Sequence, residues 1–562
     1  MANIGIDLGT TNSLVGVFEN GSVKIIPNAL GEKLTPSIVS IDDSGEVIIG
    51  RIAKERLISH PDKTVSIFKP YTGTGKKYYL DEKQFGVEEL SALILRSLKE
   101  NVESYLGDEN IEHCVISVPA YFTSSQRGAV KNAALISGLN VEKIISEPTA
   151  AALAYGMNLV DYDSQFMVLD LGGGTFDVSL MEYFEGVFNI HASAGDGYLG
   201  GEDFLNIIVE SFMEMHGLSQ ILLSPQDFFA VKSQCETIKR LLSEHEIVSK
   251  TIKIKDKEYQ FGMSNEIFFD RASDLIEKVK VPIIRVLKDT KTRVFDIDQI
   301  VLVGGASRME IFNNLIRSYF PNSEIITHDP DEAIAKGATI QAEMDAGGTS
   351  VKEYVVTDVT PFTLGIEVNS EALGKSVYLP VIERNSPVPI SKRTQVVKSD
   401  ISQKSMKIDI YQGESLNPKK NINIGAIEIP ALWDDKSQVV NVQFTYDENG
   451  IIHVDVFVDK YEIHKTLVIK NKKIVLTDEE IAAQIERVRE LKILPADKAE
   501  NRLIIAKLER LYEEFIGDER DSVYLFLERF HHALNGYDKM AIHKVRLRVE
   551  AYLSQYNFGE PE

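Results

Sequence analysis

The sequence predicts a multidomain protein in which a two-lobed α/β region is followed by an antiparallel β region and a short helical region. Two similar aspartate-glycine turns recur far apart in the first part of the chain, at 7–12 and 170–177. From about 358 to 475 the apolar residues alternate with period two, and beyond about 477 they return to helical spacing among many charges. A chain of 562 residues exceeds a single hydrophobic core, so several domains are expected.

The composition is that of a globular protein, with 44% hydrophobic and 26% charged residues. The net charge of −23 argues against binding to nucleic acid or to an anionic membrane, because both need clustered Lys and Arg. Two cysteines, Cys114 and Cys235, are too few for a disulfide or zinc framework. No stretch approaches the ~18 apolar residues of a membrane span, and the N-terminus enters a strand directly. We therefore expect a cytoplasmic protein with neither membrane nor nucleic-acid partners.

Short apolar strands alternate with amphipathic helices up to about residue 350, which is typical of an α/β fold. Each aspartate-glycine turn lies between two strand patterns. The first turn follows 3–6 and precedes 14–18, whereas the second follows 166–169 and precedes 178–180. Both therefore predict β-hairpins. A strand at 115–118 followed by a helix at 124–137 continues the alternation.

The residue types in the two turns predict a site for a nucleoside triphosphate between similar lobes. Glycine allows the backbone to approach phosphate, and backbone N–H groups and threonine hydroxyls supply donors. Asp7 and Asp170 end their strands and could hold a hydrated Mg²⁺ that bridges phosphates. One such turn alone is more often a plain hairpin turn, but the pair favours a phosphate clamp. The turn residues expected at the nucleotide are Gly9, Thr10, Thr11, Asn12, Gly172, Gly173, Gly174 and Thr175.

Two further glycine turns are weaker signals. Gly304 and Gly305 follow the strand 300–303, and they would let an adenine or a ribose lie against the backbone with Arg308 over the base. A plain strand-to-helix turn is the alternative. The segment 73–76 resembles part of the single-loop NTPase motif, but Lys77 stands where that motif needs Ser or Thr. We interpret 73–76 as a loop.

The rest of the chain divides at changes of pattern. We expect an α/β domain at 1–348, a linker at 349–357, a β domain at 358–475 and a helical region at 476–562. The linker contains the apolar run 354–356, so it either docks on a neighbour or forms an edge strand. Thr477 to Glu480 forms a capping box, and breaks at Pro495, Gly517 and Asn535-Gly536 predict about four helices.

Several long motifs carry a resemblance to a known family. They lie at 5–13, 118–122, 146–156, 170–177, 199–204 and 358–367. On these residues the chain resembles the seventy-kilodalton heat-shock chaperones, the DnaK-like ATPases of the actin superfamily. A shortened first lobe and an insertion near 370 make it most similar to the HscC branch. The resemblance implies an actin-like ATPase of two duplicated lobes, an antiparallel β-sandwich that binds peptide, a truncated helical lid and a role in the stress response.

The resemblance also implies the residues of ATP hydrolysis. Asp7 and Asp170 match the carboxylates that hold the Mg²⁺ water shell, and Glu147 matches a third carboxylate near the metal. Lys69 matches the lysine beside the attacking water, where a cation stabilises the charge that develops on the phosphoryl group. Asp177 could accept the proton of that water, and Thr175 contacts phosphate. From the residues alone, Lys69 would be assigned to the surface.

The adenosine and remaining phosphate contacts are implied in the same way. They are Gly200, Gly201, Glu202, Glu236, Lys239, Arg240, Ser243, Gly304, Gly305, Arg308 and Asp331. Residues 236, 239 and 243 differ by three and four, so we expect them on one helical face, although a solvated charged face has the same spacing. The expected cofactors are ATP or ADP and Mg²⁺, with K⁺ as a further candidate cation.

For the β region the resemblance implies strand-like recognition of peptide. The expected groove residues are Ile366, Val396, Val397, Met406 and Ile408. Where the family bridges the peptide with two apolar side chains, this chain has Asn369 and the polar region 399–400. Pro119, Arg127 and Asp358 match positions that report the nucleotide state to the linker.

The implied partners are unfolded or extended polypeptides and a J-domain co-chaperone, although Lys143 replaces an arginine implicated in binding the J-domain. The first lobe is shorter than in the family between Lys69 and Val118, which leaves the need for a nucleotide-exchange factor open. Two alternatives share the lobed ATPase, namely a small-molecule kinase and a filament-forming ATPase. The β and helical regions after 358 argue against both.

Overall fold

The computed structural model describes most of the chain. The described residues are 2–107, 110–156, 164–184, 186–254, 257–327, 329–347, 354–370, 375–400, 402–431, 433, 438–469, 478–491, 499–515, 517–535 and 539–556. The insertion near 370, part of the linker, Thr477, Pro495 and Gly536 lie outside these ranges.

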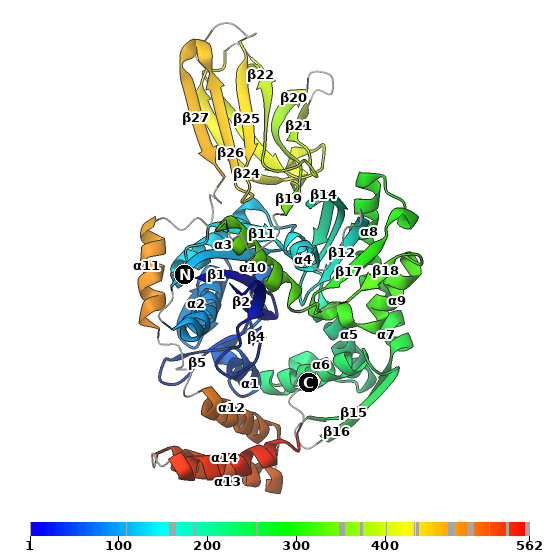
Figure 1. Ribbon diagram of the computed structural model, residues 1–562, viewed down its shortest axis with the longest axis vertical. Coiled ribbons are helices and arrows are strands. Elements are labelled where there is room, and N and C mark those ends of the chain that lie inside the picture. Colours follow the sequence, from blue (N-terminus) through cyan, green and yellow to red (C-terminus); the bar gives the residue numbers. More distant parts are fainter. Residues whose placement is uncertain are drawn as a thin grey trace.

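Two α/β lobes with matching central sheets make up the first part of the chain (Figure 1). The first sheet has the order β11-β10-β1-β2-β3, with β1 Ala2–Leu8, β2 Asn12–Glu19, β3 Ser22–Ile25, β10 Ile111–Val118 and β11 Lys143–Ser146. The second has the order β18-β17-β12-β13-β14-β19, with β12 Ser164–Leu171, β13 Phe176–Phe184, β14 Val187–Asp196, β17 Gln299–Val303, β18 Glu324–Ile326 and β19 Val355–Thr357. In the first sheet β1 forms an antiparallel hairpin with β2 and pairs in parallel with β10. In the second sheet β12 forms an antiparallel hairpin with β13 and pairs in parallel with β17. Both predicted hairpins are therefore present, and the two sheets repeat the same arrangement.

Helices pack against these sheets and connect the lobes. In the first lobe they are α2 Val87–Leu106, α3 Ser124–Ser137 and α4 Glu147–Gly156, and in the second α5 Gly201–Met215, α7 Asn265–Arg271, α8 Ser273–Thr290 and α9 Glu310–Tyr319. Helix α10 (Ala333–Asp345) packs on both β1 and α4. The approach to α4 is so close that a Cβ at Gly337 would lie 1.7 Å from the Ala150 carbonyl oxygen. Residues of both lobes consequently share one buried cluster.

Smaller elements form the outer part of each lobe. The first lobe carries β4 Thr35–Pro36, β5 Val39–Ile41, β6 Val47–Ile49, β7 Thr64–Val65, β8 Lys77–Leu80, β9 Lys83–Gly86 and α1 Arg51–Ser59. The second carries α6 Pro225–Leu241 and the hairpin of β15 Ile247–Ile254 with β16 Lys257–Ser264. Helices α1 and α6 are in contact with each other, so the lobes also meet at this end (Figure 1).

Two four-stranded antiparallel sheets follow the lobes. One has the order β21-β20-β23-β24, with β20 Leu364–Ser370, β21 Lys375–Ile382, β23 Ser405–Gln412 and β24 Ile422–Pro430. The other has the order β22-β25-β26-β27, with β22 Ile390–Val396, β25 Val440–Tyr446, β26 Ile452–Val458 and β27 Ile463–Val468. Burial alternates strictly along β25 and β26, as their period-two pattern predicts, and residues of both sheets share one core. The two sheets therefore form a β-sandwich.

The apolar run before the sandwich forms an edge strand. Strand β19 pairs in parallel with β14, with Val355 beside Val187, and so extends the sheet of the second lobe. Both interpretations of the linker therefore hold: it forms an edge strand, and because that edge belongs to the second lobe, it also docks on a neighbouring domain.

Four helices are described beyond the sandwich, namely α11 Asp478–Glu490, α12 Ala499–Glu514, α13 Gly517–Asn535 and α14 Lys539–Leu553. Helix α11 packs on α2 and α3, and α12 packs on α1, so this region lies against the two α/β lobes at a distance from the sandwich (Figure 1). In the described part of the chain, no helix combines the length and apolar character needed to cross a membrane.

Candidate functional site

The two aspartate-glycine turns meet where the lobes face each other. A Cβ on Gly173 would lie 1.7 Å from Thr11 Oγ1, and one on Gly174 would lie 3.0 Å from Thr10 Cγ2. The loop before α5 joins them, because a Cβ on Gly200 would lie 2.4 Å from the Gly174 nitrogen. The glycine backbone of the second lobe therefore lies directly against Thr10 and Thr11 of the first lobe, with no room for a side chain at these three glycines. Such a cradle suits phosphate oxygens.

Four carboxyl groups and one lysine lie buried beside this cradle. Asp7 and Asp170 are the second-to-last residues of β1 and β12, Asp177 is the second residue of β13, and Glu147 begins α4. Lys69 is buried among them, and its Nζ lies 2.9 Å from Glu147 Oε1. The sequence pattern alone favours a surface position for this lysine, but the structure places it inside the carboxylate cluster. The predicted catalytic and metal residues thus lie together.

Burial and mutual repulsion disfavour ionisation of the three aspartates in this cluster. Burial, with Glu147 as the next cause, raises the pKa of Asp7 to about 7 and that of Asp177 to about 8. The pKa of Asp170 is raised well above its usual range for the same reasons. Burial lowers the pKa of Lys69, but Glu147 and Asp7 outweigh it and the net direction is upward. One lysine cannot balance four acids, so the cluster favours a further cation.

The donor set fits a hydrated Mg²⁺. Asp170 Oδ2 is buried and has no hydrogen-bond partner in the described chain, whereas Asp7 Oδ1 accepts from Ser117 Oγ at 3.3 Å. Among the described residues, no three or more acidic, His or Cys side chains are placed to surround a metal directly. Mg²⁺ held through waters and phosphate oxygens needs few protein ligands, which agrees with this arrangement.

Helix α6 supplies part of the predicted adenosine contacts. Glu236 accepts from Arg240 Nε at 3.0 Å and lies 2.8 Å from Lys239 Nζ, which also donates to the Gly201 carbonyl at 2.9 Å. The predicted contact Ser243 lies in the turn just after this helix. The helix ends at Leu241, and the Ser243 amide donates to the Arg240 carbonyl in the following turn.

The remaining predicted contacts lie on the second lobe. Gly304 has a φ of 81°, and residues 305–308 form a short 3₁₀ helix. Arg308 Nη2 donates to Asp331 Oδ2 at 2.7 Å, and a Cβ on Gly305 would approach Asp331 within 2.8 Å. Glu202, at the start of α5, pairs with Lys232 of α6 at 2.8 Å.

The segment 73–76 is a series of turns, as interpreted from its sequence.

A contact between the site and the sandwich was missed by sequence reasoning. The Tyr121 amide donates to Asp177 Oδ1 at 3.3 Å, while the Tyr121 ring lies 4.1 Å from that of Phe362, just before β20. The Tyr121 hydroxyl accepts from Arg285 Nη1 at 2.9 Å. The sequence signal that could have indicated this contact is the motif 118–122, which contains Tyr121.

Beside Tyr121, Arg384 binds Asp289 of α8 with two hydrogen bonds of 2.6 and 2.8 Å.

The predicted allosteric residues lie near this junction. Arg127 of α3 is buried, and a Cβ on Gly450 of the sandwich would lie 2.6 Å from its Cδ. The Pro119 carbonyl accepts from the Phe122 amide at 3.1 Å, which places Pro119 in the loop that carries Tyr121. The Asp358 carbonyl accepts from Val388 at 2.9 Å at the entry to the sandwich.

The predicted groove residues differ in exposure. Ile366, Met406 and Ile408 are buried in the core that the two sheets share. Val396 is partly buried against that core, whereas Val397 is 49% exposed. The polar residues near them bond locally, because Asn369 accepts from Ser376 Oγ at 3.0 Å and Asp400 Oδ1 accepts from the Ser402 amide at 2.7 Å.

A buried lysine in the sandwich was also missed. The Lys398 side chain is buried and donates to the Trp433 carbonyl at 2.6 Å, with its Nζ 5.1 Å from the centre of the indole ring. No sequence signal distinguishes Lys398 from the surrounding exposed residues of the loop that follows β22. Its burial depends on the position of Trp433, which comes from another part of the chain.

Comparisons with known proteins identify the family of the chain. The family model described as Hsp70 protein matches residues 3–80 and 75–523. The chaperone proteins DnaK of Thermotoga petrophila and Thermotoga maritima are each 38% identical to this chain over 467 residues, which covers 80% of this chain and 77% of each relative. DnaK of Thermosipho melanesiensis is 38% identical over 469 residues, with the same coverage.

The family match extends through the sandwich and into the helical region, so it does not favour a kinase or a filament-forming ATPase. On the family model and these relatives, the chain belongs to the Hsp70 family and is an ATPase and an ATP-dependent chaperone.

Proposed function

We propose that ATP cleavage between the two lobes controls how tightly the β-sandwich holds an extended polypeptide. The observation that carries the proposal is the pairing of β19 with β14, because it makes the linker a strand of the ATPase itself. A change in the relative position of the two lobes then alters strand β14, the sheet edge with which the linker pairs. We assign the ATPase to 1–348, the linker to 349–357, the peptide-binding domain to 358–475 and the lid to 476–562.

In the proposed hydrolysis, the residues of the carboxylate cluster position the reacting groups. Mg²⁺ held near Asp7, Asp170 and Glu147 would neutralise phosphate charge. Lys69 stabilises the charge that develops on the transferring phosphoryl group. Asp177, in the ionised form that a bound cation favours, accepts the proton of the attacking water.

The described arrangement corresponds, in this proposal, to the form with low affinity for peptide. Two features support this assignment. The sandwich is joined to the second lobe through Arg384 and Asp289, and helices α11 and α12 pack on the lobes, away from the sandwich. Hydrolysis would release the linker and allow the helices to cover the peptide. Coupling of this kind is reciprocal, so peptide must also change the affinity for nucleotide.

The finer assignments rest on the sequence. The clients are unfolded or extended polypeptides, and a J-domain protein is the expected co-chaperone. The shortened first lobe supports membership of the HscC branch. We also propose a cytoplasmic location, a role in the stress response and K⁺ as an additional cation. An exchange factor that requires the longer first lobe of relatives would not fit this chain.

The test is fluorescence anisotropy of a labelled peptide library with the full chain, in ATP and in ADP. We expect weaker binding and faster exchange of peptide in ATP. The variant Thr175→Ala should bind ATP but fail to reach the high-affinity form, because it does not hydrolyse the nucleotide. Equal peptide affinity in both nucleotides would refute the proposed control of the sandwich. Stimulation of ADP release by small polyols would instead favour a kinase.

A further inference from the structure

Helix α12 covers an apolar surface on the first lobe. Ile48 of β6 and Ile52 and Ala53 of α1 are all buried. They share one cluster with Leu503 and Ala506 of α12. In the proposed function, hydrolysis allows the helical region to leave the lobes, so this surface then becomes free. An exposed apolar surface with a polar rim is typical of a site for protein–protein contact.

Acidic side chains at the edge of this surface bind arginines of α12. Arg502 Nη2 lies 3.1 Å from Asp42 Oδ2. Arg510 Nη1 lies 2.8 Å from Glu55 Oε2. Glu55 also accepts from Arg51 Nε at 3.1 Å, so it keeps a partner after α12 has left. An occupant that buries both carboxylates again is stabilised by a cation at each position.

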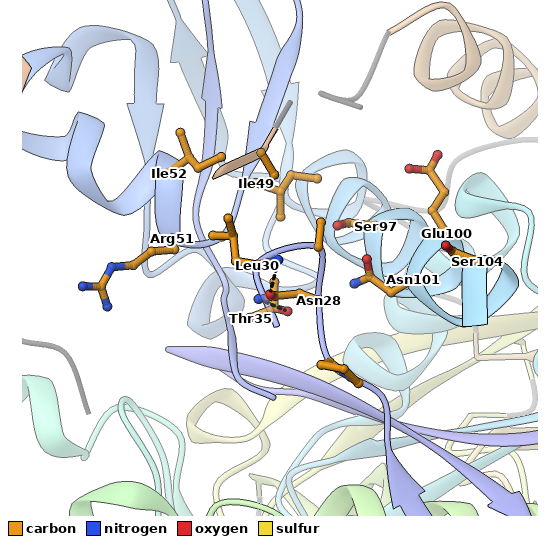
Figure 2. Close-up of a pocket in the computed structure, with 14 residues that line it drawn as sticks. Asn28, Leu30, Thr35, Ile49, Arg51, Ile52, Ser97, Glu100, Asn101 and Ser104 are labelled. Atoms are coloured by element: carbon orange, nitrogen blue, oxygen red, sulfur yellow. Dashed lines mark hydrogen bonds between the residues drawn. The ribbon is translucent and has the colours of Figure 1, made fainter. Parts of the chain in front are cut away.

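Helix α12 leaves part of the surface unfilled. Ala499, its first residue, lines a cavity of about 170 Å³ whose other described walls belong to the first lobe (Figure 2). Leu30 and Ile49 lie on one side of this cavity. Ser97 and Asn101 of α2 lie on the other, and neither side chain has a hydrogen-bond or ion-pair partner in the described part of the chain. Side chains that border a void lose packing contacts, so a residue larger than alanine would be held better here.

The two walls of the cavity select a side chain with an apolar body and a polar tip. A tyrosine at the position of Ala499 would lay its ring against the apolar wall and direct its hydroxyl to the polar wall. Filling the cavity recovers packing, and burying the ring removes apolar area from water. A helix with such a residue is therefore expected to bind this surface more tightly than α12 itself.

We infer that the surface vacated by α12 is a binding site for an amphipathic helix of a partner protein. The helix carries small or apolar residues where α12 has Leu503 and Ala506, arginines where α12 has Arg502 and Arg510, and a large residue such as tyrosine where α12 has Ala499. The inference rests on the proposed function, because the site is free only after α12 has left.

A helix bound at this site excludes α12, because both would pack on the same side chains of the first lobe. A ligand that binds only one of two states shifts the equilibrium toward that state. The partner therefore holds the chain in the form that retains peptide, even when ATP replaces ADP. The time for which a client is held is thus set in part at the first lobe.

The probe for this site is a fluorescein-labelled synthetic peptide of residues 499–514 that carries Ala499→Tyr. Its anisotropy is titrated with the full chain, in which Thr175→Ala keeps ATP intact. We expect binding in ADP to be at least about tenfold tighter than in ATP, because α12 occupies the site in ATP. In ADP the peptide without Ala499→Tyr should bind at least about tenfold more weakly than the probe. Adding Arg510→Ala to the probe should also weaken its binding.

Substitutions in the full chain test whether the cavity causes the tighter binding. Ser97→Leu fills the cavity from α2, so the probe should lose its advantage over the unsubstituted peptide. Lys99→Leu is the matched control, because Lys99 lies on the same helix and does not line the cavity. This variant should retain the full advantage. Equal affinity of the wild type for the two peptides would overturn the assignment of the cavity.

The functional effect is measured with a labelled client peptide bound to the full chain in ADP. Addition of ATP should release the client at least about tenfold more slowly when the probe is saturating. Equal binding of the probe in ATP and ADP, or unchanged release of the client, would overturn the inference. Self-association of the ADP form that the probe reverses, measured by sedimentation, would assign the surface to a second copy and overturn the proposed partner.

Hydrogen exchange separates failure of this inference from failure of the proposed function. Amides of α1 and β6 should exchange faster in ADP than in ATP, because α12 no longer covers them. Faster exchange without binding of the probe would overturn the inference alone. Unchanged protection would show that α12 stays on the first lobe in ADP, and the proposed function would then fail together with the inference.

Discussion

Asp177 and Tyr121 are joined by a hydrogen bond of 3.3 Å from the Tyr121 amide to the Asp177 carboxylate. The ring of Tyr121 packs on Phe362 at the entry to the sandwich. A shift of the sandwich therefore reaches the backbone that orients the proposed base. This is a physical route by which peptide and nucleotide can influence each other, and it involves only a few contacts.

Phe362→Ala should weaken that route. The aromatic pair contributes about 0.5–1.5 kcal/mol beyond the area it buries, so we expect the stimulation of ATP turnover by peptide to fall severalfold. Basal turnover should change by less than about twofold, because the Tyr121 amide remains. Steady-state ATPase assays with and without peptide measure both. Undiminished stimulation would contradict the role of this contact.

Thr175→Ala should reduce ATP turnover on the order of a hundredfold, as loss of one preorganised donor does in other active sites. Thr175→Ser retains the hydroxyl and should retain most of the activity. Single-turnover measurements separate hydrolysis from binding, and circular dichroism confirms folding. If the alanine variant turns over ATP normally, the assignment of Thr175 is wrong.

The stability of the nucleotide-free protein should fall as pH rises. Burial, with Glu147 as the next cause, raises the pKa of Asp7 to about 7 and that of Asp177 to about 8 in the folded chain, from an ordinary value of 3.8. The folded chain therefore holds more protons than the unfolded chain between these values, and this contribution is lost as pH rises through about 8. Thermal melts in EDTA from pH 6 to pH 9 measure the effect. A melting temperature that increases over this range would contradict it.

Mg²⁺ with ADP should flatten the same pH dependence, because a bound cation stabilises the ionised carboxylates. Calorimetry in buffers of different ionisation enthalpy should show proton release on Mg²⁺-ADP binding near pH 7. Asp7→Asn, which cannot ionise, should release fewer protons. Equal release by the variant would exclude Asp7 as a source of those protons.

Asp289→Ala should loosen the sandwich from the second lobe. Arg384 makes two charge-assisted hydrogen bonds to Asp289, and the pair is only partly exposed, so we expect a loss of about 1–3 kcal/mol in the docking of the two domains. Peptide should then bind more tightly in ATP. Anisotropy titrations measure this, and small-angle scattering should show a more extended molecule. An unchanged peptide affinity in ATP would refute the role of the pair.

Cys114 and Cys235 should resist thiol reagents in the native protein. Both are buried free cysteines, and burial raises the pKa of each to about 12. Reaction with Ellman's reagent at pH 8 should therefore be slow until denaturant is added. Rapid labelling of the folded chain would show that these cores open more readily than the packing indicates.

Local patterns in the sequence determined the two hairpins, the phosphate turns, the strands β25 and β26 and the helix α3, because each depends on neighbouring residues and on periods of two or 3.6. The same reasoning did not locate the end of α6, which is decided by the turn that follows Leu241. Periodicity shows which face of an element is apolar. It does not show where the element ends or what that face meets.

Only the tertiary structure decided which distant residues act together. Lys69 and Glu147 are 78 positions apart in the chain, and Arg510 and Glu55 are 455 apart, yet both pairs are buried ion pairs. The pairing of β19 with β14 likewise depends on an edge that another domain leaves open. Contacts of this kind arise from the packing of whole elements, because a buried charge finds its partner wherever the fold brings one within reach.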